Sequence, residues 1–370
     1  VAGVDPRSAT HRALCDRLDG AAPPLWIIAV GKAAGTMADA AIDAIRLHNA
    51  SASGGLIISP ALSAAPDATV DVVVGDHPVP SSQSRHASDL LGELAERING
   101  EGTVFVLLSG GATSLIAGPA EGVPDRDLGW MFEALLTSGA DITVMNAIRK
   151  RFTRWGAGRL ARALAPARVH CLIVSDVVGD DIPSIGSGPC APDSRTSADV
   201  AALIDREGLE AYVPRALREM LASPTAASEP PAPDDPAFDR VECTVILGNR
   251  DALDAGARWA ADHGVTPVRV VAEPLIDDAT FTAQRIIDEL VRYREASVPD
   301  ESSESPRFAC MLWGGETTVR LGAGETTPGG RSQELALAAA DALRSEGERG
   351  VGLTLLAAGT DGRDGNTDAA

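Results

Sequence analysis

The chain has 370 residues, 45% of them apolar, which is enough for two domains with a large buried core. Its 52 acidic and 32 basic residues give a net charge of -20, so a polyanion such as nucleic acid should be repelled rather than bound. There is no secretory signal pattern and no apolar run of about 18 residues, so we expect a cytoplasmic protein without a membrane segment.

Short apolar, β-branched runs recur along the chain, each followed by Gly, Ser or Asp and then by a helix-like pattern. This order predicts strand, loop and helix units, and therefore an α/β fold with a mainly parallel sheet and helices on both faces. The clearest runs are residues 25–30, 103–108, 169–174, 241–247, 308–313 and 353–358. The five cysteines are widely spaced and contain no CxxC pair, which indicates reduced structural thiols.

The segment from Ala222 to Arg240 is rich in Pro, Ala, Ser and acidic residues, which favours a linker or a surface excursion. We therefore expect an N-terminal Rossmann-like domain at residues 1–230 and a smaller α/β domain at residues 241–370. The final residues, TDGRDGNTDAA, stop inside a loop and an opening helix, which suggests that part of a native C-terminal region is missing.

In an open α/β sheet, ligands bind beyond the carboxyl ends of the strands. The first strand leads into the Gly31–Gly35 turn, where Lys32 is one of only two lysines in the chain. The turn has the glycine spacing of neither a P-loop nor a dinucleotide site. Lys32 is therefore either a ligand for a phosphate or carboxylate, or a solvated side chain beside a packing glycine.

The second such loop follows residues 103–108 and consists of small residues that let an oxyanion approach backbone N–H groups. We expect it to bind substrate or phosphate, the alternative being a plain glycine-rich turn. Its members are Ser109, Gly110, Gly111, Ala112, Thr113 and Ser114. His77 lies in a loop after another predicted strand. It either contacts substrate or is only part of an ordered loop, and the sequence favours neither alternative.

Carboxylates follow the strand at residues 169–174. Asp176 is favoured as a Mg²⁺ ligand or a proton acceptor over Asp180 and Asp181, which suit helix caps or turns equally well.

Further candidates lie in the second half of the chain. Arg331 opens an Ala- and Leu-rich helix and could clamp an oxyanion or pair with Glu334 at the surface. Asp361, Asp364 and Asp368 have a spacing loose enough for Mg²⁺, but their glycine neighbours also suit turns. Of these three, Asp361 is the predicted metal ligand alongside Asp176.

Several motifs in order along the whole chain resemble the class II glycerate 2-kinase family: VGKAAG, GDHPVP, LLSGGATS, the NAIRK stretch, SDVVGDDIPSIGSGP followed by APD, GNRDAL, GGETT, GGRSQELAL and AAGTDGRDGNTDAA. The resemblance implies an N-terminal α/β domain, a C-terminal MOFRL domain, and ATP-dependent phosphorylation of the 2-hydroxyl of D-glycerate in a cleft between them. It also implies catalytic roles for Lys32 and Arg331.

Within this kinase interpretation, Asp176 is the third catalytic residue and Lys150 joins the substrate-binding set. The predicted nucleotide-binding residues are Ser187, Gly188, Asp193, Asn249 and Glu316. Phosphoryl transfer depends on positioning and charge neutralisation, which these groups with Mg²⁺ could supply. An NAD(P)H-dependent hydroxypyruvate reductase and a non-catalytic sensor of small organic acids are the alternatives. The sequence leaves both a monomer and a homodimer open.

Overall fold

The computed structural model describes residues 4–225, 228–296, 308–319, 328–360, 362, 364, 365 and 367. They form two compact units: residues 5–248, called the sheet unit below, and residues 249–370 with residues 1–4, called the C-terminal unit. None of the described helices is long and apolar enough to cross a membrane.

A six-stranded sheet with the order β3-β2-β1-β4-β5-β6 forms the centre of the sheet unit, and every neighbouring pair is parallel. This confirms the predicted α/β class. The strands are β1 (Leu25–Val30), β2 (Ala52–Ser59), β3 (Val70–Val74), β4 (Thr103–Leu108), β5 (Arg168–Val174) and β6 (Val241–Leu247).

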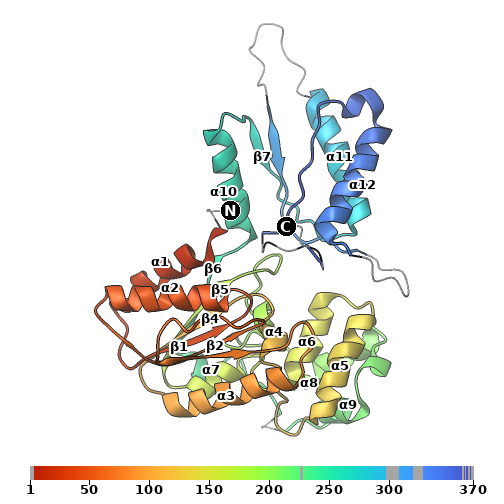
Figure 1. The fold of residues 1–370 in the computed structure, drawn as a ribbon. Helices are drawn as coiled ribbons and strands as arrows, with labels where there is room; N and C mark the ends of the chain where they lie inside the picture. Colours follow the sequence, from red (N-terminus) through yellow and green to blue (C-terminus); the bar gives the residue numbers. More distant parts are fainter. Residues whose placement is uncertain are drawn as a thin grey trace. The chain divides into compact units, whose positions relative to one another are not determined.

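Helices cover both faces of this sheet, as Figure 1 shows, because the buried strands are apolar on both sides. On β1, Ile27 packs with α1 and α2, whereas its neighbour Ile28 packs with the opposite layer that contains α3 and α7. The covering helices are α1 (Pro6–Leu18), α2 (Ala34–Leu47), α3 (Ser82–Ile98), α4 (Ala112–Leu115) and α7 (Arg159–Leu164).

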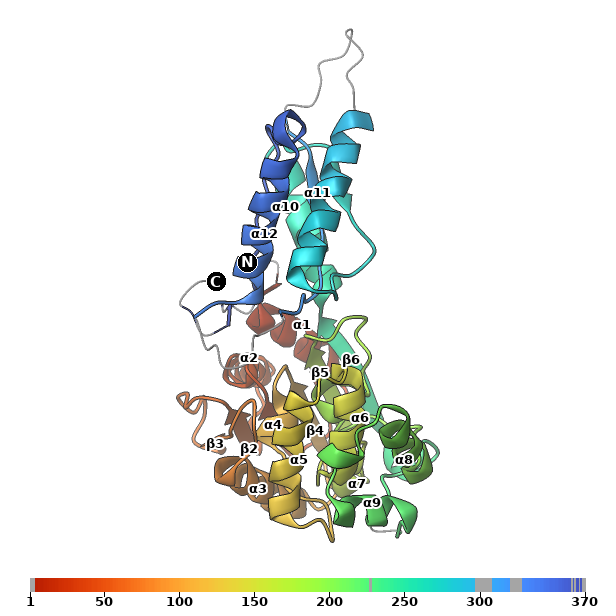
Figure 2. The same ribbon diagram turned by 90° about the vertical axis from the view of Figure 1, so that its right-hand side faces the viewer.

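A helical cluster with its own apolar core lies beside the sheet (Figure 2). It contains α5 (Asp125–Thr137), α6 (Ile142–Phe152), α8 (Ser197–Arg206) and α9 (Arg215–Ala222). Local sequence sets some of the boundaries. For example, Thr196 and Asp199 form a capping box that begins α8, with each side chain accepting a hydrogen bond from the other residue's backbone N–H.

The described residues of the segment from Ala222 to Arg240 belong to the sheet unit. The middle of the segment is held to the rest of the sheet unit, because Glu229 pairs with the buried Arg151 and the Ser228 carbonyl accepts a hydrogen bond of 2.7 Å from Arg159. β6 then completes the sheet by pairing with β5. The structure therefore divides the chain at Gly248 rather than within residues 231–240, because sheet pairing assigns Val241–Leu247 to the first unit.

The C-terminal unit is a smaller α/β unit with a two-stranded parallel sheet. Its elements are α10 (Asn249–Asp262), β7 (Val268–Val270), α11 (Ala279–Ala296), β8 (Cys310–Leu312) and α12 (Arg331–Ser345). The strand predicted at residues 353–358 was wrong: this segment has no sheet partner among the described residues. Its apolar residues serve packing instead, since the partly buried Leu353, Leu355 and Ala357 lie against the core of α11 and α12.

Candidate active site

The candidate site lies where the strand order of the sheet unit reverses. The chain moves from β1 outward to β2 and β3, and then returns to place β4 on the other side of β1. In open α/β sheets this reversal opens a crevice between the loops that follow the two central strands. Those loops are the Gly31–Gly35 turn after β1 and the Ser109–Ser114 loop after β4, both predicted from the sequence.

Hydrogen bonds lock these two loops together. The Lys32 backbone N–H donates to the Gly110 carbonyl at 2.9 Å, and the Ala33 N–H donates to Ser109 Oγ at 3.0 Å. The two loops can approach this closely only because residue 31 is a glycine. Gly31 has a φ of +130°, and a Cβ there would lie 2.5 Å from the Ser109 carbonyl oxygen. The first glycine of the turn therefore serves packing, while the Lys32 side chain remains exposed.

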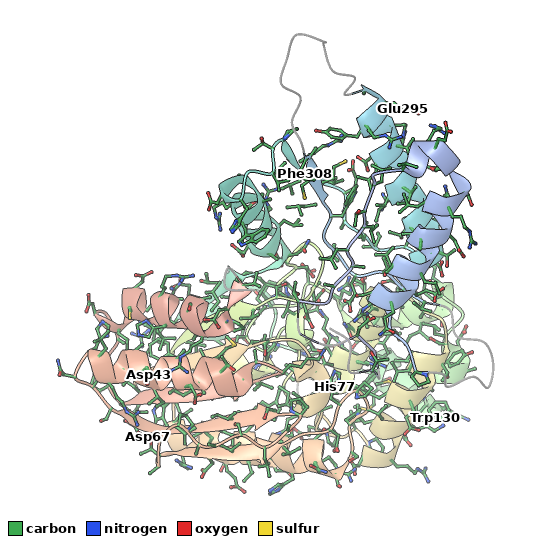
Figure 3. The ribbon with its side chains drawn as sticks, turned by 45° about the horizontal axis from the view of Figure 1, so that its top comes forward. Asp43, Asp67, His77, Trp130, Glu295 and Phe308 are labelled. Atoms are coloured by element: carbon green, nitrogen blue, oxygen red, sulfur yellow. The ribbon has the colours of Figure 1, made fainter. Side chains whose placement is uncertain are left out.

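Three side chains that follow different strands, Lys32, His77 and Asp176, lie close to two glycines, Gly110 and Gly111. Both glycines belong to the Ser109–Ser114 loop, called the β4 loop below. A Cβ on Gly110 would lie 2.0 Å from Asp176 Oδ2, and a Cβ on Gly111 would lie 2.9 Å from His77 Cδ2 and 3.7 Å from Lys32 Cγ. Asp176 follows β5 and His77 follows β3. Figure 3 shows His77 at this end of the sheet, with Asp43 and Asp67 toward the other end.

The electrostatics of this cluster agree with its geometry. Partial burial lowers the pKa of His77, the Lys32 ammonium lowers it further, and the Asp176 carboxylate opposes both. His77 is therefore mainly neutral at pH 7. Asp76, its neighbour, has a separate structural role: burial opposes ionisation, but hydrogen bonds from Ser81 and from backbone N–H groups of α3 outweigh it and lower the pKa of Asp76.

The hydroxyl groups predicted to contact phosphate all make contacts within the protein. Ser114 Oγ donates to the Gly111 carbonyl at 3.2 Å, and Thr113 Oγ1 lies 3.0 Å from the buried Ser187 Oγ. Ser109 Oγ accepts the Ala33 N–H, so its own proton is still available as a donor.

The loop that carries Ser187 packs on the short helix α4. A Cβ on Gly186 would lie 3.0 Å from the side chain of Ala112, which is fully buried. Gly188 has a φ of +58°, and a Cβ there would lie 2.7 Å from the Pro183 carbonyl oxygen. Ser187 therefore supports the β4 loop, whereas Gly188 permits a close approach within its own loop.

Lys150 and Asp193 occur together, but inside the protein rather than at an open surface. Lys150 Nζ lies 3.1 Å from Asp193 Oδ2, and the two side chains are only 2% and 4% exposed. Burial lowers the pKa of Lys150, while the Asp193 carboxylate opposes this change. The geometry gives both residues a structural ion pair, although the sequence assigned them to substrate and nucleotide.

The C-terminal unit contains three other predicted residues, and two of them pair with each other. Arg331, at the start of α12, forms an ion pair with Glu316, and both side chains are about half exposed. The Asn249 side chain lies against Gly314, where a Cβ would be 2.3 Å from Asn249 Oδ1. Asp361 lies outside the described residues.

Sequence reasoning missed the role of Asp364, which it had grouped with possible metal ligands. Its carboxylate accepts the backbone N–H groups of Ser332 and Gln333 at 2.9 and 2.8 Å, and so caps α12 beside Arg331. Burial opposes ionisation of Asp364, but these hydrogen bonds prevail and lower its pKa. The GGRSQE motif gave no signal of this cap, because Asp364 lies more than 30 residues further along the chain.

Comparison with known proteins agrees with this architecture. Residues 1–222 match the family model described as Domain of unknown function (DUF4147), and residues 309–370 match the MOFRL family. A D-glycerate 2-kinase from Thermotoga maritima is 35% identical over 93% of this chain and 76% of its own length. This chain belongs to the glycerate kinase family with a C-terminal MOFRL domain.

Other members of the glycerate kinase family support the same assignment. A human glycerate kinase is 30% identical, covering the whole of this chain and 80% of the human protein. A protein from Agrobacterium vitis named putative hydroxypyruvate reductase is 33% identical over the whole chain and 79% of its own length. The crystal structure of a Thermotoga maritima glycerate kinase superimposes with a TM-score of 0.79 at 31% identity, covering 100% of this chain and 82% of that one.

Proposed function

We propose that this protein transfers the γ-phosphoryl group of ATP to the 2-hydroxyl of D-glycerate, forming ADP and 2-phosphoglycerate. The observation that carries the proposal is the meeting of Lys32, His77 and Asp176 at Gly110 and Gly111, at the switch point of the sheet. This arrangement occurs in a chain related along 93% of its length to a protein named D-glycerate 2-kinase.

The charges at this edge suit phosphoryl transfer, which requires positioning and neutralisation more than covalent chemistry by the protein. The exposed Lys32 ammonium would balance the charge of the transferred phosphoryl group or of the acceptor carboxylate. The Ser109 hydroxyl would donate a hydrogen bond to an acceptor oxygen. Asp176 would take the proton of the 2-hydroxyl or help to hold a metal ion.

Mg²⁺ is the metal ion that ATP chemistry most often uses. The described residues contain no group of three or more His, Cys, Asp or Glu side chains that could hold a metal on their own. One carboxylate fits Mg²⁺ nevertheless, because in nucleotide sites this ion binds one or two carboxylates together with phosphate oxygens and water. Asp176 is that carboxylate in our proposal, and the ion would neutralise the phosphate charge.

Arg331 is proposed as a second cation for the phosphate groups. Its guanidinium pairs with Glu316 at a half-exposed position, so an incoming phosphate could take over part of this pairing. An Arg331→Lys variant is expected to lose activity, because an ammonium cannot reproduce two parallel N–H donors. Activity equal to that of the unchanged protein would exclude a bidentate role for Arg331.

The decisive assay follows ADP release from ATP and Mg²⁺ on addition of D-glycerate, with chromatographic identification of the product. NADH or NADPH loss with hydroxypyruvate is measured in parallel, because the Agrobacterium vitis relative carries the name of a reductase. Glycerate-dependent ADP release with 2-phosphoglycerate as product supports the proposal. Coenzyme oxidation alone would assign the reductase instead, and no turnover in either assay would favour a sensor of small organic acids.

The sequence-based expectations of a cytoplasmic location, of a cleft between two domains, and of a monomer or homodimer stay predictions. ATP as phosphoryl donor and Mg²⁺ as the activating ion are part of the proposal. Replacing each in turn, with formation of 2-phosphoglycerate as the readout, tests them individually.

A further inference from the structure

Gly110 is a glycine for a reason that its backbone does not explain. Its φ does not lie in the left-handed region, so an L-residue could adopt its backbone conformation. The neighbouring Gly111 differs, since its φ is +86°. What excludes a side chain at Gly110 is the Asp176 carboxylate, which lies 2.0 Å (Oδ2) and 2.7 Å (Cγ) from the place a Cβ would take.

The two residues come from adjacent parallel strands. Gly110 follows β4 and Asp176 follows β5, and the backbone before Asp176 is fixed by a hydrogen bond of 2.8 Å from the Ser175 N–H to the Leu247 carbonyl. Asp176 itself is exposed, so its carboxylate rests on the surface of the β4 loop rather than in the core. A methyl group at Gly110 would therefore meet the end of a side chain, not the backbone.

We infer that Gly110 is a positioning residue that acts through Asp176: the missing side chain lets the carboxylate lie against the β4 loop, beside Lys32 and His77. This inference deepens the proposed function, on which it rests. The sequence assigned Gly110 to phosphate binding through its N–H group, whereas the geometry gives it a role through its bare α-carbon.

The test is the Gly110→Ala variant of the full chain. The new methyl group has to push Asp176 Oδ2 from 2.0 Å to beyond 3.0 Å, the shortest separation that real Cβ atoms show. The displaced atom ends an exposed side chain, so we expect the melting temperature to stay within about 2 °C of the unchanged protein. We expect kcat to fall about as far as in Asp176→Asn.

A double-mutant cycle separates positioning from a general structural effect. If Gly110 acts through Asp176, the combined Gly110→Ala/Asp176→Asn variant loses no more kcat than the worse single variant. Gly92→Ala, in α3, is the matched control, because its Cβ would lie 2.4 Å from Nη2 at the end of the Arg154 side chain. We expect this control to keep the kcat of the unchanged protein.

A crystal structure of Gly110→Ala gives a readout that does not depend on turnover. We expect a displaced Asp176 carboxylate and an unmoved Ser109–Ser114 backbone. An unmoved carboxylate with a shifted loop, normal kcat in Gly110→Ala, or additive losses in the cycle would each overturn the inference. If the unchanged protein does not phosphorylate glycerate, the proposed function fails, while the crystal structure still decides whether Gly110 positions Asp176.

Discussion

Replacing Lys150 by Met should destabilise the protein strongly without removing a ligand contact. Lys150 Nζ lies 3.1 Å from Asp193 Oδ2, with both side chains almost fully buried. Methionine has a similar length and no charge, so the substitution leaves the buried carboxylate with only the more distant Arg195 guanidinium as a counter-ion, 3.8 Å from Oδ1 and 42% exposed. Removing one partner of a buried ion pair typically costs about 3–5 kcal/mol.

The structure favours the lower end of this range. Asp193 keeps a second partner, because the Arg195 backbone N–H donates to its Oδ1 at 3.3 Å. We therefore expect a loss of about 3 kcal/mol in the free energy of unfolding. For a domain of this size, that corresponds to a fall in melting temperature of roughly 6–12 °C.

The assay is urea unfolding followed by circular dichroism, with kcat measured in parallel at a temperature where the variant is folded. The Lys150→Met/Asp193→Asn double variant should lose less stability than the sum of the two single variants. Arg126→Met serves as a surface control: its guanidinium is 95% exposed beside Asp127, so a change below about 0.5 kcal/mol is expected. A Lys150→Met variant that unfolds normally but has lost its turnover would refute the reasoning and restore Lys150 to the substrate site.

Three further predictions follow from the contacts described above. Lys32→Ala should lower kcat by about 10²-fold or more while the melting temperature hardly changes, since the side chain is exposed; near-normal turnover would remove Lys32 from the mechanism. Asp364→Ala should cost about 0.5–2 kcal/mol through loss of the α12 cap. The pKa of Asp364 is lowered in the folded protein, so the stability it contributes is complete above the ordinary value of about 3.8 and is lost as pH falls through the lower, folded value. The Asp364→Ala variant should therefore lose less of its free energy of unfolding on acidification than the unchanged protein. An equal loss in both proteins would contradict the cap. Gly129→Ala should stabilise helix α5 by about 0.5–1 kcal/mol, because no atom beyond the backbone of its own helix and its chain neighbours lies within 4 Å of the new Cβ. Gly31→Ala should destabilise by about 2 kcal/mol or more in the same denaturation assay, and equal effects would contradict both predictions.

Local sequence was sufficient to find three of the four strands that lead into the site. The runs 25–30 and 103–108 coincide with β1 and β4, and the run 169–174 lies within β5, whereas no range was predicted for β3, which precedes His77. Apolar β-branched residues flanked by Gly and Ser carry this signal, since buried parallel strands are apolar on both faces. The same signal failed at residues 353–358, because an apolar segment can pack every second side chain on helices without pairing in a sheet.

Side-chain roles were harder to predict, because they depend on partners distant in the chain. The lysine count singled out both Lys32 and Lys150 as candidate ligands. In the fold, Lys32 is exposed at the switch point, whereas Lys150 is buried against Asp193. Nothing in the NAIRK stretch indicates this difference, because burial of the ammonium depends on the segment that later supplies the carboxylate.

The sequence by itself determined the α/β class, the central strands, the loops that follow them and the family, because hydrophobic periodicity and short glycine-rich motifs are local properties. Only the tertiary structure decided which loop residues meet. The placement of β4 beside β5 sets Asp176 on Gly110. Because β3 is parallel to the central strands, its carboxyl end lies at the same end of the sheet, and the loop after it brings His77 to Gly111. Strand order is set by packing across the whole sheet, so these contacts cannot be read from any one segment.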